Sequence, residues 1–174
     1  IKSDIDKLKA IKIDLSKTGS SVDILIGKTI SIYRMRLSQN EKNINEILNS
    51  SIDYAENDII ELSDKEIIYS DSEAQLKDKI RKQLKHEIIF QLFTKHYNSD
   101  SYDRILQLFD EEEPAVRESV KVRYLKYLKR LNTELCNNSK HLSIYLNCMA
   151  FMYDPHSAYF SAEIKKRFDE SISV

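Results

Sequence analysis

The chain of 174 residues is 41% hydrophobic and 32% charged, a balance too polar for a membrane-spanning protein and too apolar for a disordered one. Its 27 basic and 28 acidic residues cancel to a net charge of -1, so no overall electrostatic field would collect nucleic acid or anionic lipid. Its two glycines complete neither a Gly-x-Gly-x-x-Gly nor a full P-loop motif, which excludes the two common Gly-rich nucleotide sites.

The two cysteines, Cys136 and Cys148, have no His cluster near them in a zinc-like spacing, so no metal or cofactor is predicted. Helical rise would set them about 15 Å apart, which is beyond disulfide reach. The longest uncharged runs, such as Leu142–Tyr153, are shorter than the roughly 20 apolar residues that span a bilayer. The first residues carry neither an initiator Met nor a signal peptide, and we expect the chain to be a segment of a longer protein.

Apolar residues at three- and four-residue steps predict helices over most of the chain. The first is predicted from about Ser3 to Leu15, ending at Ser16–Gly19. A long second helix is predicted over Val22–Leu48, with a break or a solvent-facing turn left open at the polar stretch Ser38–Lys42.

Residues 49–71 contain only short apolar islands among acids and Asn, which indicates one long, ordered, extended connection. A third helix is predicted to begin at Ser72, because Ser72 and Gln75 have the capping-box spacing. Strict four-residue steps of Leu and Ile continue it to about Asn98.

A short helix is predicted over Tyr102–Phe109, followed by a separate one with Pro114 in its first turn. The last core helix is predicted to start at Ser139 and to end at Asp154 and Pro155, with a shorter helix opening at Ser161. The predicted fold is therefore all-α, an irregular multi-helix bundle with one extended connection.

Four groups of reactive or charged residues are better explained by structure than by chemistry. The acids Asp53, Glu56, Asp58 and Glu61 lack the glycine turn of a calcium loop and are interpreted as a solvated loop. His86 and Glu87 have no second His at the spacing of a zinc site and are interpreted as a solvated charged face of their helix. The basic run Lys121, Arg123, Lys126, Lys129 and Arg130 includes Tyr124 and Tyr127 at core-facing spacing, which disfavours nucleic-acid binding. Cys148, which could be paired with His141 or His156, lies in an apolar stretch and is interpreted as a small buried hydrophobe.

The run Asp154-Pro155-His156-Ser157-Ala158-Tyr159-Phe160-Ser161 resembles a junction motif of bacterial tail-specific, or C-terminal processing, proteases. In that family the motif, Asp-Pro-His-Thr-x-Tyr-Leu-Ser-Pro, joins an N-terminal helical domain to a PDZ domain. Further segments are similar to the family in the same order: Glu73-Ala74-Gln75-Leu76, Arg123-Tyr124 with Lys129-Arg130-Leu131, Asn138-Ser139, and 168–174. Departures from it are Ser157 and Ala162, where the family has Thr and Pro, and the absence of any Trp.

The resemblance implies that residues 1–160 form the helical N-terminal domain and that 161–174 lead into a PDZ domain absent from the chain. It implies a parent serine endopeptidase of the cell envelope or periplasm, with a serine nucleophile and a lysine base outside this segment, which would itself be inert. Partners would be the PDZ and protease domains of the parent chain, unfolded protein substrates, and an adaptor or a second copy. Asp154, Pro155, His156, Ser157 and Tyr159 would form the structural interdomain junction, with Asp154 ending a helix, Pro155 enforcing the turn and His156 pinning the chain.

Two other interpretations stay open from the sequence. A free-standing helical adaptor would bind a partner helix in a groove. A reactive pair of Cys148 and His156 would make the chain itself an enzyme whose activity is lost on thiol labelling.

Overall fold

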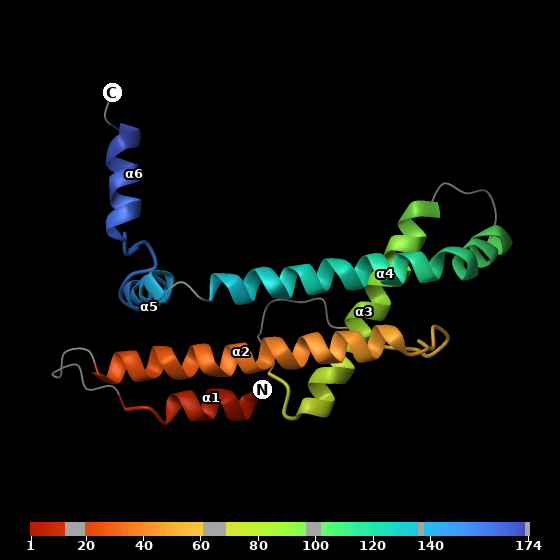
Figure 1. Ribbon diagram of the computed structural model, residues 1–174, viewed down its shortest axis with the longest axis horizontal. Coiled ribbons are helices and arrows are strands. Elements are labelled where there is room, and N and C mark those ends of the chain that lie inside the picture. The colour runs from red at the N-terminus through yellow and green to blue at the C-terminus, as the bar shows by residue number, and fades with distance from the viewer. Residues whose placement is uncertain (13–19, 61–68, 97–101, 136–137, 173–174) are drawn as a thin grey trace.

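The residues that the computed structural model describes form six helices and contain no β-strand (Figure 1). The described residues are 1–12, 20–60, 69–96, 102–135 and 138–172. The helices are α1 Lys2–Lys9, α2 Ser20–Asn49, α3 Glu73–His96, α4 Tyr102–Glu134, α5 Asn138–Tyr153 and α6 Ala162–Ile172. The prediction of an all-α bundle is confirmed.

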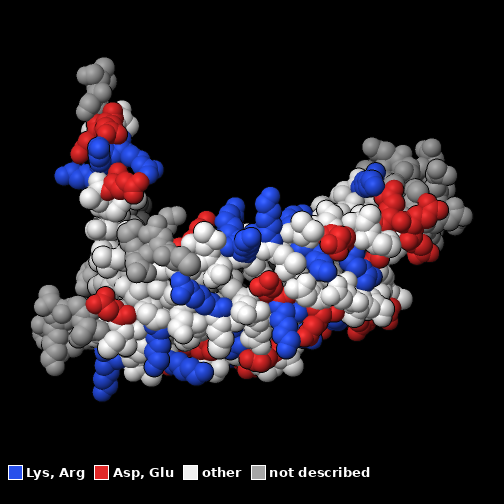
Figure 2. Space-filling model, in the orientation of Figure 1, with Lys and Arg blue, Asp and Glu red and all other residues white. Residues whose placement is uncertain are grey.

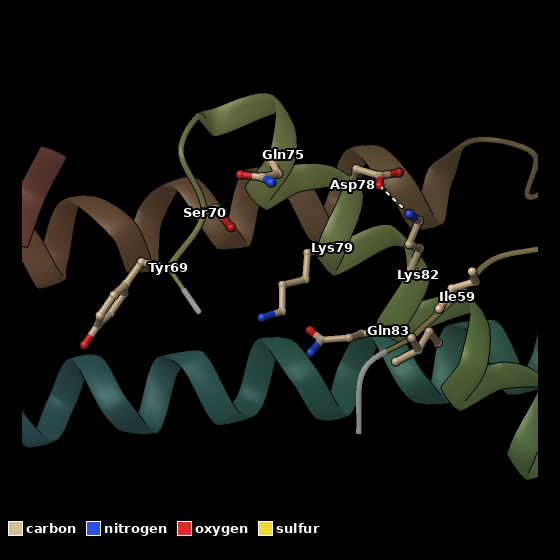
Figure 3. Close-up of a pocket in the computed structure, with 9 residues that line it drawn as sticks. Ile59, Tyr69, Ser70, Gln75, Asp78, Lys79, Lys82 and Gln83 are labelled. Atoms are coloured by element: carbon tan, nitrogen blue, oxygen red, sulfur yellow. Dashed lines mark ion pairs between the residues drawn. The ribbon is translucent and has the colours of Figure 1, made fainter. Parts of the chain in front are cut away.

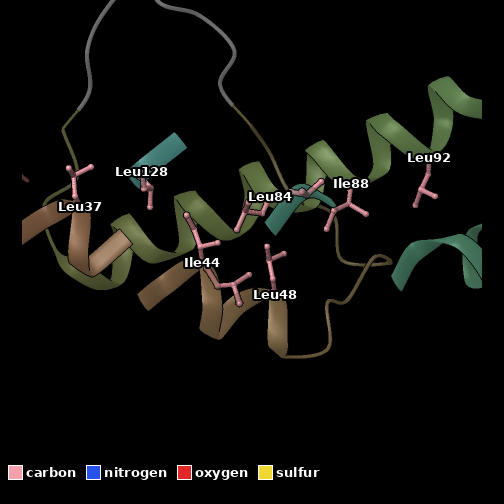
Figure 4. Packing of buried hydrophobic residues seen from close by; sticks show 9 residues of the cluster. Leu37, Ile44, Leu48, Leu84, Ile88, Leu92 and Leu128 are labelled. Atoms are coloured by element: carbon pink, nitrogen blue, oxygen red, sulfur yellow. The ribbon is translucent and has the colours of Figure 1, made fainter. Parts of the chain in front are cut away.

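The core lies where α2, α3 and α4 meet (Figure 4). Helices α2 and α4 are antiparallel, since Lys121 near the middle of α4 donates to Asn49 Oδ1 at 2.9 Å while Arg34 reaches the Leu135 carbonyl at 3.2 Å. Helix α3 crosses this pair at a steep angle. The buried apolar side chains are Leu37, Ile44, Ile47, Leu48, Leu84, Ile88, Leu92, Val120 and Leu128. Burying each stabilises the fold by about 1.5–3 kcal/mol relative to exposure, so this cluster is the main support of the bundle.

Helix α3 packs in the core because its Leu and Ile residues recur at four-residue steps and therefore share one face. Leu84, Ile88 and Leu92 are 0–3% exposed and lie on one face of α3. The predicted cap is present as well, because the Gln75 N–H donates to Ser72 Oγ at 3.2 Å. The Gln75 side chain reaches back to the Asp71 N–H at 2.5 Å, one residue beyond the usual capping-box partner.

The second helix runs without a break through Ser38–Lys42. That polar stretch faces mainly away from the core, whereas Leu37 before it and Ile44 after it are both buried. The core-facing side of the helix is therefore continuous, and the polar residues lower its stability little.

The first helix is shorter than predicted, because α1 ends at Lys9 rather than near Leu15. Its last turn tightens, with the Ile11 N–H donating to the Leu8 carbonyl at 3.1 Å. A helix of this length is not stable alone and depends on tertiary contacts such as that of Arg36 with the buried Asp4 at 2.7 Å. Leu15 and the predicted stop at Ser16–Gly19 lie outside the described residues.

The prediction of two helices on either side of 110–113 is wrong, since α4 is one helix of 33 residues with Pro114 inside it. An interior proline normally costs a helix about 3 kcal/mol. Here Phe109 and Val116, on either side of the proline, both pack against the core. Glu113 is also held, by the Tyr54 hydroxyl and by Arg117 Nε at 2.7 Å. Tertiary contacts thus outweigh the local signal.

The extended connection is confirmed over 50–60 and 69–71, where the structure has no helix. The interpretation of its acids as solvated is wrong for Asp58, whose side chain is only 9% exposed. Asp58 binds Lys85 and Arg81 of α3, and Tyr54 packs edge-on against Phe109 at 4.9 Å between ring centroids. Glu61 lies outside the described residues.

Candidate interdomain junction

The junction begins where α5 ends, and Asp154 organises it. The Asp154 N–H donates the last helical bond, to the Ala150 carbonyl at 3.0 Å. The Asp154 carboxylate then accepts two bonds, from the His156 N–H at 3.0 Å and from the Ser157 hydroxyl at 2.9 Å. The Ser157 N–H donates to the Asp154 carbonyl at 2.9 Å. Because the proline cannot continue the helix, these bonds turn the chain sharply at its end.

These bonds lower the pKa of Asp154, with the His156 N–H as the larger cause and the Ser157 hydroxyl as the second. The carboxylate is therefore ionised and acts only as an acceptor. His156 contributes through its main chain, and its side chain is exposed. The helix ends at Asp154 and the chain turns at Pro155, with the His156 N–H bound to the Asp154 carboxylate, whereas the role of these residues as an interdomain junction stays a prediction.

A side chain that the sequence analysis missed, Asn147, fixes the far side of the turn. Its amide group pairs with both main-chain groups of Tyr159: the Tyr159 N–H donates to Asn147 Oδ1 at 2.9 Å, and Asn147 Nδ2 donates to the Tyr159 carbonyl at 3.2 Å. We call this pairing the Asn147 clamp. The available signal was an amide side chain within an otherwise apolar helical run, where Asn has low helix propensity.

Beyond the clamp the chain enters α6 through a second cap. The Ile164 N–H donates to Ser161 Oγ at 3.3 Å, and the rings of Phe160 and Phe168 lie 5.8 Å apart. The predicted helix start at Ser161 is thus confirmed. Helix α6 projects away from the bundle, at the end of the molecule where α5 lies (Figure 1).

The junction is surrounded by exposed apolar side chains. Residues 151–160 are all exposed, and on α6 the side chains of Ile164, Phe168 and Ile172 are 46–60% exposed. The most exposed apolar side chains of the junction are Met152 at 84% and Tyr153 at 87%, which are consecutive residues at the end of α5. Large exposed apolar groups gathered in this way are typical of an interaction surface.

The reactive residues of α5 are not brought together as a catalytic pair. Cys148 is exposed, so its interpretation as a buried hydrophobe is wrong. It lines a groove of about 290 Å³ between α2 and α5 together with His141. Cys148 lies seven positions after His141 along the helix, which is about 10 Å of rise and too far for a hydrogen bond between them. Cys136 lies outside the described residues.

Other candidate chemistry is sparse in the described ranges. No three His, Cys, Asp or Glu side chains there lie close enough together to hold a metal ion. None of the helices described there has the length and apolar character needed to cross a membrane. The fragment Gly27-Lys28-Thr29 lies inside α2, so its backbone is helical and forms no phosphate-binding loop.

A pocket of about 280 Å³ with a mixed polar and apolar lining lies between the extended connection and α3 (Figure 3). Tyr69 and Ser70 face it from the connection, and Lys79 and Gln83 from α3. The second lysine of its wall, Lys82, is paired with Asp78 at 2.9 Å. The pocket therefore combines hydrogen-bonding groups with little net charge.

The basic run on α4 is divided between structural contacts and solvent. Tyr124 packs against the core as predicted, but Tyr127 is 48% exposed, so its core-facing assignment is wrong. Lys121 binds Asn49, and Arg123 binds Glu87 of α3 at 2.6 Å.

Comparison with known protein families identifies the family to which this chain belongs. A family model described as the tail-specific protease N-terminal domain matches residues 1–163. The chain belongs to this family. No curated protein and no solved structure shows a significant match to it. The matched residues 1–163 contain α1 to α5, the Asp154 turn, the Asn147 clamp and the cap at Ser161 of this chain.

Proposed function

We propose that this chain is the non-catalytic scaffold domain of a cell-envelope serine endopeptidase that processes the C-termini of proteins. It would hold the PDZ and protease domains of its parent in register and help to admit unfolded C-termini. Family membership supports the protease parent. The observation that carries the scaffold role is the Asn147 clamp, which fixes how the chain leaves the bundle.

A scaffold must control the direction of the chain that it passes on. In the junction, Asp154 fixes the first three residues of the turn and Asn147 fixes Tyr159 against the helix that precedes it. The turn is thus held at both ends, at its start by the Asp154 side chain directly after α5 and at its far end by the Asn147 side chain of α5. Such a connection transmits orientation in a way that a Gly/Ser-rich linker would not.

The apolar surface of α5 and α6 supports the same role. Phe151, Met152 and Tyr153 are 61–87% exposed, which is unfavourable in water unless another surface covers them. The folded domains that follow in a parent protease would be held next to this surface by the junction. Covering it would lock the domains in one arrangement.

The chemistry would belong to the rest of the parent enzyme. The catalytic serine and lysine that the resemblance implies are not assigned to any residue of this chain. The chain itself would contribute shape and help to admit the substrate. Placement in the cell envelope is part of the same proposal.

The test uses the parent enzyme, identified by reading the gene beyond Val174. A PDZ domain followed by a Ser/Lys protease domain is expected there, and a stop codon would instead support a free-standing adaptor. In that enzyme, Asn147→Ala should slow cleavage of a protein with an unfolded C-terminus more than cleavage of a short peptide.

A matched control is Asn45→Ala, which removes a single amide bond to a helix carbonyl, at 2.9 Å from Glu41, far from the junction. It should leave both activities unchanged. Equal loss in both Asn variants, or labelling of the isolated 174-residue chain by a fluorophosphonate, would contradict the scaffold role.

A further inference from the structure

A groove between α2 and α4 is lined by more basic than acidic side chains, and two of its lysines form no ion pair in the described part of the chain. It encloses about 440 Å³ and runs between the two antiparallel helices. Its floor is apolar, formed by Leu37, Leu125 and Leu128. Its rim carries three cations, Arg34, Lys126 and Lys129, and one acid, Glu41.

The surplus is local, since the whole chain has a net charge of -1. Between Glu118 and Glu134 the sequence of α4 contains five cations and no acid. Figure 2 shows Lys and Arg side chains gathered over the middle of α4, along the upper edge of the molecule. Of the five, Lys121 and Arg123 bind Asn49 and Glu87 within the fold.

The remaining three cations, Lys126, Lys129 and Arg130, are exposed. Arg130 lies over the exposed ring of Tyr127, at 5.4 Å from its centroid. Lys126 and Lys129 form no ion pair with any acid in the described part of the chain, and both line the groove. Like charges held close together on one rim repel each other, and an anionic partner would relieve that repulsion.

We propose that this groove docks an acidic segment of polypeptide, with carboxylates against the lysines and apolar side chains on the leucine floor. The occupant follows from charge complementarity on the rim combined with an apolar base. A duplex would meet too few cations, since nucleic-acid affinity depends on many phosphate contacts. A membrane surface is too broad to reach a floor that lies between two helices.

The probe is a fluorescein-labelled peptide of repeated Glu-Leu-Glu-Ser units, with binding to the 174-residue chain followed by fluorescence anisotropy. The same peptide with Gln in place of Glu should bind at least about tenfold more weakly. Lys126→Glu combined with Lys129→Glu should weaken binding of the acidic peptide by a similar factor. Glu41→Gln, which removes the acid of the rim, should strengthen it.

The matched control is Lys28→Glu combined with Lys165→Glu, two exposed lysines away from the groove that change the net charge by the same amount. It should bind the acidic peptide as the unmodified chain does, and far-UV circular dichroism should show all variants to be equally helical. Equal weakening of peptide binding by the two double variants would show that binding depends on overall charge and not on the groove, and would overturn the proposal. Failure of the acidic peptide to bind would overturn it too, as would tighter, lysine-dependent binding of an oligonucleotide or of phosphatidylglycerol vesicles.

Discussion

The carboxylate of Asp58 lies 2.9 Å from Lys85 Nζ, and the two side chains are only 9% and 5% exposed. The same carboxylate is held by Arg81, whose guanidinium reaches both of its oxygens at 2.8 and 3.1 Å. Lys85 also donates to the Glu56 carbonyl at 2.6 Å. A buried charge needs such a set of partners, so the extended connection is fastened to α3 by paired charge as well as by apolar packing.

This cluster predicts a loss of stability in acid. The bonds from Arg81, and next those from Lys85, lower the pKa of Asp58 to about 2. The folded-state pKa is below that of the unfolded chain, so the contribution is complete above about pH 4 and is lost as the pH falls toward 2. The midpoint of urea unfolding should drop in that range.

Asp58→Asn isolates this contribution, because it leaves Lys85 buried without its counter-charge. The variant should be clearly less stable than the unmodified chain at pH 6, and the difference in urea midpoint should shrink in acid. Glu46→Gln is the control, since the Glu46–Lys77 pair lies at an exposed site where ion pairs contribute little. A difference for Asp58→Asn that stays constant from pH 6 to about pH 2 would contradict the assignment.

Sequence patterns were sufficient to predict those features of the fold that neighbouring residues determine. The four-residue steps of Leu84, Ile88 and Leu92 predicted the core face of α3, and the pair Asp154-Pro155 predicted the end of α5. The partners of Asp58 are 23 and 27 residues away, and Tyr159 is 12 residues from Asn147. No periodicity connects such pairs, because their pairing depends on how the helices pack and turn. The same reason accounts for Tyr127, whose spacing is core-facing but whose side chain is 48% exposed because no helix in the described ranges covers it.

The core predicts a second outcome. Leu84 is completely buried where α3 crosses the other two long helices, so Leu84→Ala should reduce the free energy of unfolding by about 2–5 kcal/mol. Val122→Ala, at a 55% exposed position of α4, is the comparison and should change it by no more than about 0.5 kcal/mol. Urea titration followed by circular dichroism measures both, and similar losses in the two variants would show that the core lies elsewhere.

The Asn147 clamp predicts a local change with little effect on global stability. Asn147→Ala removes the acceptor of the Tyr159 N–H, at an exposed site where a hydrogen bond contributes about 0.5–1.5 kcal/mol. Amide hydrogen exchange at Tyr159 should therefore become faster, whereas the core amides of α3 keep their protection. Asn45→Ala should alter neither region. Unchanged exchange at Tyr159 would show that the clamp does not hold the junction in solution.

Pro114 predicts a gain of stability on substitution. It is exposed and lies in the interior of α4, where it cannot donate the bond that the Asp110 carbonyl would accept. Pro114→Ala supplies that N–H and a better helix former, so the free energy of unfolding should rise by about 1–3 kcal/mol. Glu118→Ala, exposed on the same helix, controls for alanine propensity alone and should give a much smaller gain. If Pro114→Ala instead lowered stability, the proline would have to shape α4 so that Phe109 and Val116 both reach the core, and the Tyr54–Phe109 contact would be expected to weaken with it.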